Sequence, residues 1–132
     1  MVTIAIANQK GGVGKSTLAR ELAACLALRG FSTLAIDADP QGNLTRSWVG
    51  TDMYELTLAH VMADPESGEP ATLPDIILGA PVDNLDLAPA NIRLARVERG
   101  PDYLTLRLRH QVEEYCQGYD FVIIDCKPDL GK

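Results

Sequence analysis

Short apolar runs alternate with stretches of helical spacing along the chain. Four mostly apolar runs have the length of strands and are expected to form a buried parallel sheet: Val2–Ala7, Phe31–Asp37, Asn84–Ala88 and Phe121–Ile124. Between the first two runs, apolar residues recur at helical spacing from Lys15 to Arg29, and Gly30 stands where a helix is expected to end. Strand, glycine-rich loop, helix and strand together predict a βαβ unit with a right-handed crossover.

The middle and the end of the chain predict further helices, separated by turn-forming residues. The expected helical segments are Leu44–Val49, Leu58–Ala63, Asn91–Arg99 and a last helix that Asp102 caps and Gly118 ends. The apolar stripe of the last helix is Leu104, Leu108, Val112 and Tyr115. Asp64–Pro74 holds Pro and Gly breakers among acidic residues and is expected to be a surface loop. The alternation predicts an α/β fold, with a parallel sheet and flanking helices, in one domain.

Composition and charge argue against several classes of protein. The 132 residues carry a formal net charge of -6, whereas a surface that binds nucleic acid throughout would be basic. No apolar run approaches the roughly 20 residues that a membrane helix needs. The three cysteines show no CxxC spacing, and an odd count without a secretory leader indicates a reducing, cytoplasmic location. We interpret Cys25 and Cys116 as small apolar residues buried on helices.

The most unusual polar segments of the chain directly follow predicted strands. They are Asn8–Thr17, Asp37–Asn43 and Asp125–Lys132. The carboxyl ends of parallel strands meet at one edge of a sheet, and folds of this class bind their ligands there. These segments are therefore expected to form one site.

A glycine-rich segment follows the first strand and reads Lys10-Gly11-Gly12-Val13-Gly14-Lys15-Ser16-Thr17. Its glycines let backbone N–H groups approach phosphate oxygens, and the following helix adds the positive end of its dipole. In such a phosphate loop Lys15 reaches the β- and γ-phosphates, Ser16 binds Mg²⁺, and Thr17 donates towards the α-phosphate. The alternative is a glycine-rich turn without a ligand, which rarely carries Gly-Lys-Ser after further glycines. Gln9 stands where the usual phosphate-loop pattern has glycine.

Carboxylates stand at the ends of two predicted strands. Asp37 and Asp39 follow the second strand, and Asp125 closes the fourth. Mg²⁺ is commonly held by one or two carboxylates together with phosphates, and phosphoryl transfer needs a group that orients the attacking water. Taken alone, Asp-x-Asp-Pro is an ordinary turn, and an apolar strand that ends in Asp is common. Beside a phosphate loop, the same residues predict a site for Mg²⁺ and a nucleotide.

Lys10 gives the loop a second lysine, and with it the segment resembles the deviant Walker A motif of the ParA/MinD ATPases. Asp37–Asn43 is similar to the switch segment of ParA proteins, and Tyr119–Asp125 looks like a Walker B strand. The resemblance implies that residues 1–132 are the N-terminal part of a single P-loop ATPase domain, which stops after the Walker B strand. It also implies a homodimer that forms with ATP, in which Lys10 reaches the nucleotide of the other subunit.

The resemblance also implies roles for individual residues in partition of a plasmid or chromosome. Asp39 is implied to orient the attacking water, while Ser16, Asp37 and Asp125 hold Mg²⁺. The implied catalytic residues are Lys10, Lys15 and Asp39. Full-length ParA relatives act with non-specific DNA and a ParB-like partner protein, and they need no membrane.

Two departures from the family leave other functions open. Lys127 and Asp129 replace a proline and a serine that follow the Walker B strand in the family, and ParA proteins continue well beyond Lys132. A related ATPase that positions another cargo would share these motifs, as would a non-catalytic nucleotide-binding or interaction module. The family's later strands lie beside the first strand, so Val2–Ala7 is expected to be an unpaired apolar edge that seeks another chain.

Overall fold

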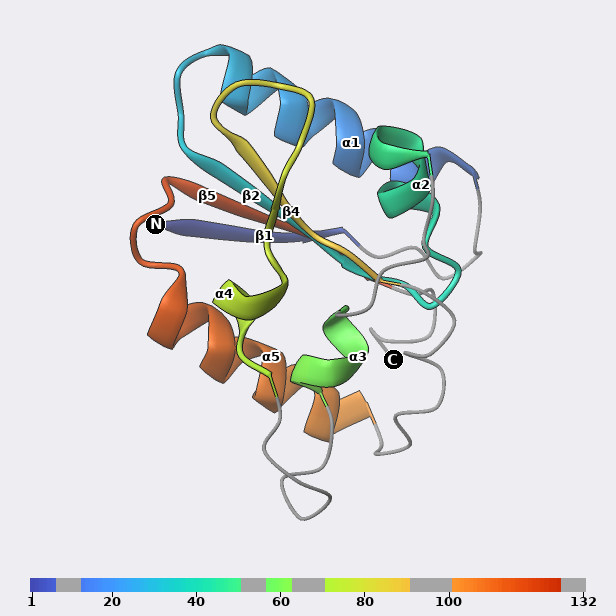
Figure 1. The fold of residues 1–132 in the computed structure, drawn as a ribbon, viewed down its shortest axis with the longest axis vertical. Coiled ribbons are helices and arrows are strands. Elements are labelled where there is room, and N and C mark those ends of the chain that lie inside the picture. The colour runs from blue at the N-terminus through green and yellow to red at the C-terminus, as the bar shows by residue number, and fades with distance from the viewer. Residues whose placement is uncertain (7–12, 51–56, 63–70, 91–100, 127–132) are drawn as a thin grey trace.

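A five-stranded β-sheet forms the centre of the molecule, and helices cover both of its faces (Figure 1). The computed structural model describes residues 1–6, 13–50, 57–62, 71–90 and 101–126, and their side chains except those of 13–16 and 101–105. The strands lie in the order β1 (Val2–Ile6), β5 (Phe121–Cys126), β2 (Thr33–Ala38), β4 (Leu85–Ala88) and β3 (Leu78–Gly79). The helices are α1 (Val13–Leu28), α2 (Asn43–Val49), α3 (Leu58–Val61), α4 (Leu73–Ile76) and α5 (Pro101–Tyr115). In Figure 1, α1 and α2 lie on one side of the sheet, and α3, α4 and α5 lie on the other.

The strands predicted from the sequence form the parallel part of the sheet. β1 pairs with β5, β5 with β2, and β2 with β4, all in the parallel direction. The predicted α/β fold class is therefore confirmed. The sequence does not predict β3, which pairs antiparallel with β4 at the other edge. Its two residues are too few for an alternation of apolar and polar positions to be recognised.

Small side chains let α1 lie close against the sheet. Ala19, Ala23 and Ala27 recur at four-residue spacing and are at most 1% exposed. This spacing places the three methyl groups on one face of the helix. They share a core layer with Ala35 of β2 and Ile123 of β5, so α1 covers the central strands.

The ends of α1 differ slightly from the predicted range Lys15–Arg29, since the helix begins at Val13 and ends at Leu28. Gly30 adopts a φ of 93° and donates its N–H to the Ala27 carbonyl at 2.9 Å. This left-handed φ favours glycine, and it ends the helix as the sequence predicts. The earlier start includes the end of the glycine-rich segment in the first turn of α1.

The opposite face of the sheet carries α5, whose predicted stripe is only partly right. Leu108 and Val112 are buried, whereas Tyr115 is 39% exposed at the end of the helix, and the side chain of Leu104 lies outside those that the structure describes. α5 begins at Pro101, so Asp102 lies within its first turn and the prediction that Asp102 caps the helix is wrong. Proline suits the first helical position because the missing N–H would have no partner within the helix.

The shorter helices agree with the sequence in two places and differ in one. α2 and α3 confirm the two short helices predicted in the middle of the chain, except that Ala63 lies outside the described residues, as does the predicted helix Asn91–Arg99. α4 was not predicted, because the expected loop extended to Pro74. Thr72 donates its N–H and its hydroxyl to the Asp75 carboxylate, at 2.8 and 3.0 Å, and these bonds lower the pKa of Asp75. Such a pairing stabilises the first turn of a short helix.

Only one of the two cysteine predictions is right. Cys116 is buried, and burial raises the pKa of its thiol to about 11. Cys25 is exposed on α1. It follows Ala23 by two residues, which turns it about 200° around the helix from the alanine face. Apolar residues lie on more than one face of α1, so helical spacing alone does not say which face is covered.

β1 lies at one edge of the sheet, where its only partner among the described strands is β5. Its residues are exposed or half-buried, and Val2 is 51% exposed. This agrees with the expectation of an uncovered first strand, although Ala7 lies outside the described residues. No helix in the described part of the chain is long and apolar enough to cross a membrane.

Candidate nucleotide site

Two buried carboxylates lie side by side at the carboxyl ends of the central strands. Asp37 of β2 and Asp125 of β5 are partners in the register, and both are 0% exposed. Two residues earlier on each strand, Ala35 and Ile123 belong to the core layer under α1. Side chains two apart on a strand share a face, so both carboxylates point to the side of the sheet that α1 covers. β5 continues to Cys126, one residue past the acid that was expected to close it.

Asp37 is held by hydrogen bonds from two segments of the protein. Its Oδ2 accepts the Thr45 hydroxyl at 2.6 Å and the Thr45 N–H at 2.9 Å, and its Oδ1 accepts the Asp39 N–H at 3.2 Å. Burial raises the pKa of Asp37 to about 6; the bonds from Thr45 and Asp39 oppose the shift, and the charge of Asp125 adds to it. The raised pKa means that these donors do not fully compensate the buried negative charge. A cation beside the two acids would do so.

Asp39 lies just beyond β2, in a loop whose turns are held by its own oxygens. The residue is 7% exposed, its Oδ1 accepts the Gln41 N–H at 3.0 Å, and its carbonyl accepts the Gly42 N–H at 2.9 Å. Gly42 has a φ of 68°, which favours glycine, and α2 begins at the next residue. The loop therefore keeps a further carboxylate directly after the acid pair.

The amino end of α1 lies at the same end of the sheet as the acids. α1 follows the carboxyl end of β1 and leads back to the amino end of β2, as a crossover between parallel strands requires. Val13–Ser16 form the first turn of α1, and Thr17, the next residue, is exposed. Lys10–Gly12 lie outside the described residues. Unpaired N–H groups and the helix dipole attract anions to such an end.

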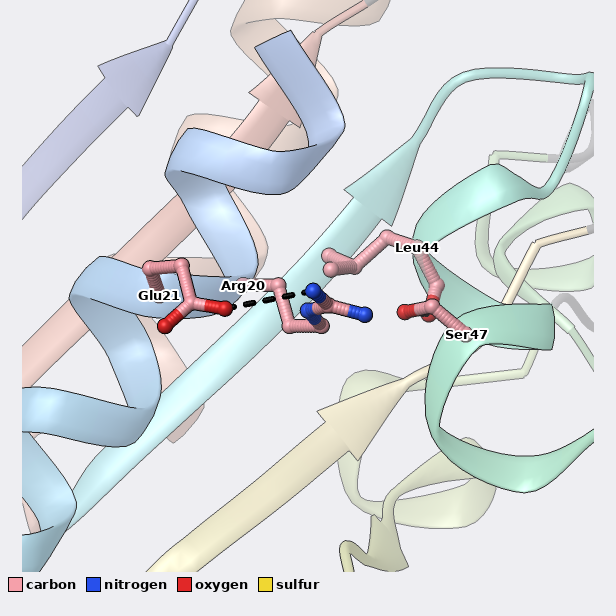
Figure 2. Close-up of polar contacts among 4 residues, drawn as sticks. All are labelled: Arg20, Glu21, Leu44 and Ser47. Atoms are coloured by element: carbon pink, nitrogen blue, oxygen red, sulfur yellow. Dashed lines mark hydrogen bonds and ion pairs between the residues drawn. The ribbon is translucent and has the colours of Figure 1, made fainter. Parts of the chain in front are cut away.

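α2 packs against α1 and keeps the loop after β2 close to the helix that carries the glycine-rich segment. Figure 2 shows Arg20 of α1 reaching towards Leu44 and Ser47 of α2, with Nη2 at 3.2 Å from Oε1 of Glu21. Leu44 is fully buried in the core layer under α1. An exposed ion pair such as Arg20–Glu21 contributes little. Leu44 therefore contributes to the apolar contact between α2 and the layer under α1, and Trp48 and Val49 of α2 pack against the same layer.

The donors of this region suit a hard divalent cation that binds together with phosphates. Among the described residues, no group of three or more His, Cys, Asp or Glu side chains could hold a metal by itself. Mg²⁺ needs fewer ligands from the protein, because it keeps waters and takes phosphate oxygens. Asp37 and Asp125 offer two carboxylates for it, and α1 begins at the same end of the sheet.

Thr45 is a residue of this region that the sequence does not single out. It lies in a short predicted helix between Leu44 and Arg46, where a threonine is unremarkable. Its hydrogen-bond partners, Asp37 and Ala90, lie eight and 45 residues away in the chain. Only the tertiary structure brings these three residues together.

Comparison with known proteins places the chain in a family. Residues 1–132 match AAA_31, an AAA domain. The chain is 44% identical over 133 residues to the sporulation initiation inhibitor protein Soj of Bacillus subtilis (strain 168). It is 43% identical over 126 residues to the probable plasmid-partitioning protein ParA of Thermus thermophilus. The chain therefore belongs to the AAA_31 domain family, and it is similar to Soj and ParA proteins, as its motifs predict.

The chain spans half or less of the length of these relatives. The match with Soj covers 97% of the chain and 50% of Soj, and the match with ParA covers 92% and 36%. A solved structure, cobyrinic acid a,c-diamide synthase from Mycobacterium smegmatis with bound ATP analog and magnesium, is similar with a TM-score of 0.84 at 30% identity. The match covers 98% of this chain and 52% of the synthase chain. A protein that shares the fold thus holds an ATP analogue and Mg²⁺.

Proposed function

We propose that this protein binds ATP and Mg²⁺ and hydrolyses ATP as a ParA-like partition ATPase that dimerises when ATP is bound. The observation that carries the proposal is the buried pair Asp37 and Asp125, at the end of the sheet where α1 begins. The partition role is supported by the names of Soj and ParA, to which the chain is 44% and 43% identical. The proposed partners are a second copy of the protein, DNA without sequence preference and a ParB-like protein.

The proposed phosphate site is the glycine-rich segment and the first turns of α1. Its backbone N–H groups bind the phosphates, and the positive end of the helix dipole attracts them. Lys15 is proposed to neutralise the β- and γ-phosphates, and Lys10 those of the other subunit in the dimer. The nucleotide-binding residues proposed are Lys10, Gly11, Gly12, Val13, Gly14, Lys15, Ser16 and Thr17.

The acids are proposed to hold the metal and to prepare the water. Bound Mg²⁺ neutralises charge on the phosphate oxygens during phosphoryl transfer. Ser16, Asp37 and Asp125 are the residues that would hold it, and the raised pKa of Asp37 favours a cation there. Asp39 is proposed to orient the attacking water, since its loop keeps the residue directly after the acid pair.

The two lysines of the loop provide a matched test of this function. Lys15→Ala is expected to weaken binding of Mg-ADP about 10- to 100-fold, because a bond to a charged group contributes about 1.5–3 kcal/mol. Lys10→Ala removes the same charge from the same loop, but it should leave binding to the monomer unchanged and lower ATP-dependent dimerisation. Calorimetric titration measures the first effect and sedimentation the second. Unchanged nucleotide binding by Lys15→Ala would refute the phosphate site.

Release of phosphate from ATP separates the proposed ATPase from its alternatives. A non-catalytic nucleotide-binding module would bind Mg-ATP with no turnover above that of Lys15→Ala. A related ATPase with another cargo would hydrolyse ATP without stimulation by DNA and a ParB-like protein. Turnover that both of these partners stimulate is the result expected for a partition ATPase.

A further inference from the structure

A buried chain of hydrogen bonds joins the acid pair to the segment that follows β4. Thr45 donates its hydroxyl to Oδ2 of Asp37 at 2.6 Å, and the same hydroxyl oxygen accepts the Ala90 N–H at 3.0 Å. Thr45, Asp37 and Ala90 are each 0% exposed. The chain of bonds therefore runs through the interior, where an unmade hydrogen bond is costly.

Ala90 lies where three elements meet. It comes two residues after the end of β4 at Ala88, and its N–H bonds to α2 through Thr45. The neighbouring Pro89 accepts the Leu58 N–H at 2.8 Å, at the start of α3. The exit of β4 is thus bonded to α2 on one side and to α3 on the other. Loss of the Thr45 hydroxyl would leave the buried Ala90 N–H without this acceptor.

Thr45 also sets how the Asp37 carboxylate is oriented. Both Thr45 donors bind Oδ2, while the Asp39 N–H binds Oδ1. Because the two oxygens are held by different segments, a rotation of the carboxylate breaks bonds to at least one of them. The orientation of Asp37 beside Asp125 therefore depends on α2 and on the loop that carries Asp39.

We propose that Thr45 is a positioning residue of the nucleotide site, which orients Asp37 for the metal and couples it to the exit of β4 through Ala90. The inference rests on the proposed function for its ligand, whereas the bonds themselves are independent of it. Thr45 acts through Asp37, as outer partners of metal ligands do elsewhere. Loss of such a partner commonly lowers metal affinity about 10- to 100-fold.

Thr45→Val tests the proposal, because it removes the hydroxyl but keeps the backbone N–H and nearly the same shape. Affinity for Mg-ADP is expected to fall about 10-fold. Affinity for ADP in EDTA should stay the same, since the glycine-rich segment is unchanged. Hydrogen–deuterium exchange at the Ala90 amide should become about 5- to 10-fold faster, as the loss of one hydrogen bond predicts.

Two further variants separate positioning from a general loss of stability. Thr33→Val is the matched control, because Thr33 is also 0% exposed and its hydroxyl donates to the Phe31 carbonyl at 2.9 Å, within its own segment. It should change neither the magnesium dependence of ADP binding nor exchange at Ala90. Thr45→Ser keeps the hydroxyl and is expected to restore both properties.

Several results would overturn the proposal. One is an equal loss of Mg-ADP affinity in Thr45→Val and Thr33→Val, and another is a loss in Thr45→Ser as large as in Thr45→Val. If Thr45→Val does not fold, hydrogen–deuterium exchange at Ala90 is measured in the parent and in Thr45→Ser instead. An Ala90 amide that exchanges in these proteins as fast as in an unstructured peptide would refute its bond to Thr45. If the parent binds no ADP, the proposed function fails, and exchange at Ala90 still tests the chain of bonds separately.

Discussion

Two neighbouring strands with similar apolar content differ completely in burial. β1 is exposed or half-buried along its length, whereas every residue of β5 after Phe121 is buried. Composition does not explain this, because the buried strand is the one that carries Asp125. β5 pairs with β1 on one side and β2 on the other, while β1 has a described partner on one side only. Burial in this sheet is therefore set by the order of the strands rather than by hydrophobicity.

The same difference explains why the acids lie where they do. Asp125 is flanked in the register by Ile6 of β1 and Asp37 of β2, and no water-exposed face remains to either acid. A carboxylate removed from water has a raised pKa and favours a cation nearby. A carboxylate on β1 at the same level would remain partly solvated. A carboxylate on the central strands of this sheet is thus better placed to bind a metal ion than one on β1.

The largest expected effect comes from shortening the same side chain on each strand. Ile4 and Ile123 are register partners in the same core layer, but Ile123 is 0% exposed and Ile4 is half-buried. Ile123→Ala is expected to lower the free energy of unfolding by about 3–4 kcal/mol, and Ile4→Ala by about 1 kcal/mol. Urea denaturation of both variants measures the difference. Equal losses would mean that β1 is covered in solution and that the comparison of the two strands is wrong.

The next effect concerns the buried charge on the central strands. The pKa of Asp37 is raised from 3.8 to about 6, so the folded state binds this proton more tightly than the unfolded state does. Stability should therefore be greatest below about pH 4 for this group and fall as the pH rises to about 6, by at most about 3 kcal/mol. Asp37→Asn carries no charge here, so this decline should be absent from its unfolding free energy.

Urea denaturation without metal or nucleotide, at several values between pH 4 and pH 8, compares Asp37→Asn with the parent. The other carboxylates are shared by the two proteins, so their contributions cancel in the difference. In Asp37→Asn, an amide NH₂ group stands where Oδ1 of Asp37 accepts the Asp39 N–H, so this hydrogen bond is lost. Its loss lowers the unfolding free energy of the variant by the same amount at every pH. If the difference in unfolding free energy between the two proteins does not change with pH, burial does not raise the pKa of Asp37.

The smallest effect on stability is expected at the edge strand. Thr3 is exposed on β1, so Thr3→Lys should change the free energy of unfolding by no more than about 0.5 kcal/mol. If the free edge of β1 pairs with another chain, the added charge should weaken that self-association. Sedimentation at several protein concentrations measures it. Gln117→Lys, an equal change of charge on another exposed position, serves as the control and should have no such effect.

Much of the candidate site could be predicted, because its acids lie at or just beyond the carboxyl ends of strands. Asp37, Asp39 and Asp125 stand out in the sequence by their place after apolar runs, and the parallel register then brings Asp37 and Asp125 together. Thr45 could not be predicted in the same way. Its role depends on contact with Asp37 and Ala90, and no local pattern marks a threonine that makes such contacts.

The amino-acid sequence by itself determined the alternation of strands and helices, the stop of α1 before Gly30 and the carboxylates at the strand ends. These features depend on neighbouring residues, such as Gly30, whose left-handed backbone ends the helix. The tertiary structure decided that Cys25 is exposed, that Tyr115 lies partly outside the core and that Thr45 binds Asp37. These features depend on which distant segments pack together, and residues of the same type and spacing can be buried or exposed according to the neighbours that the fold supplies.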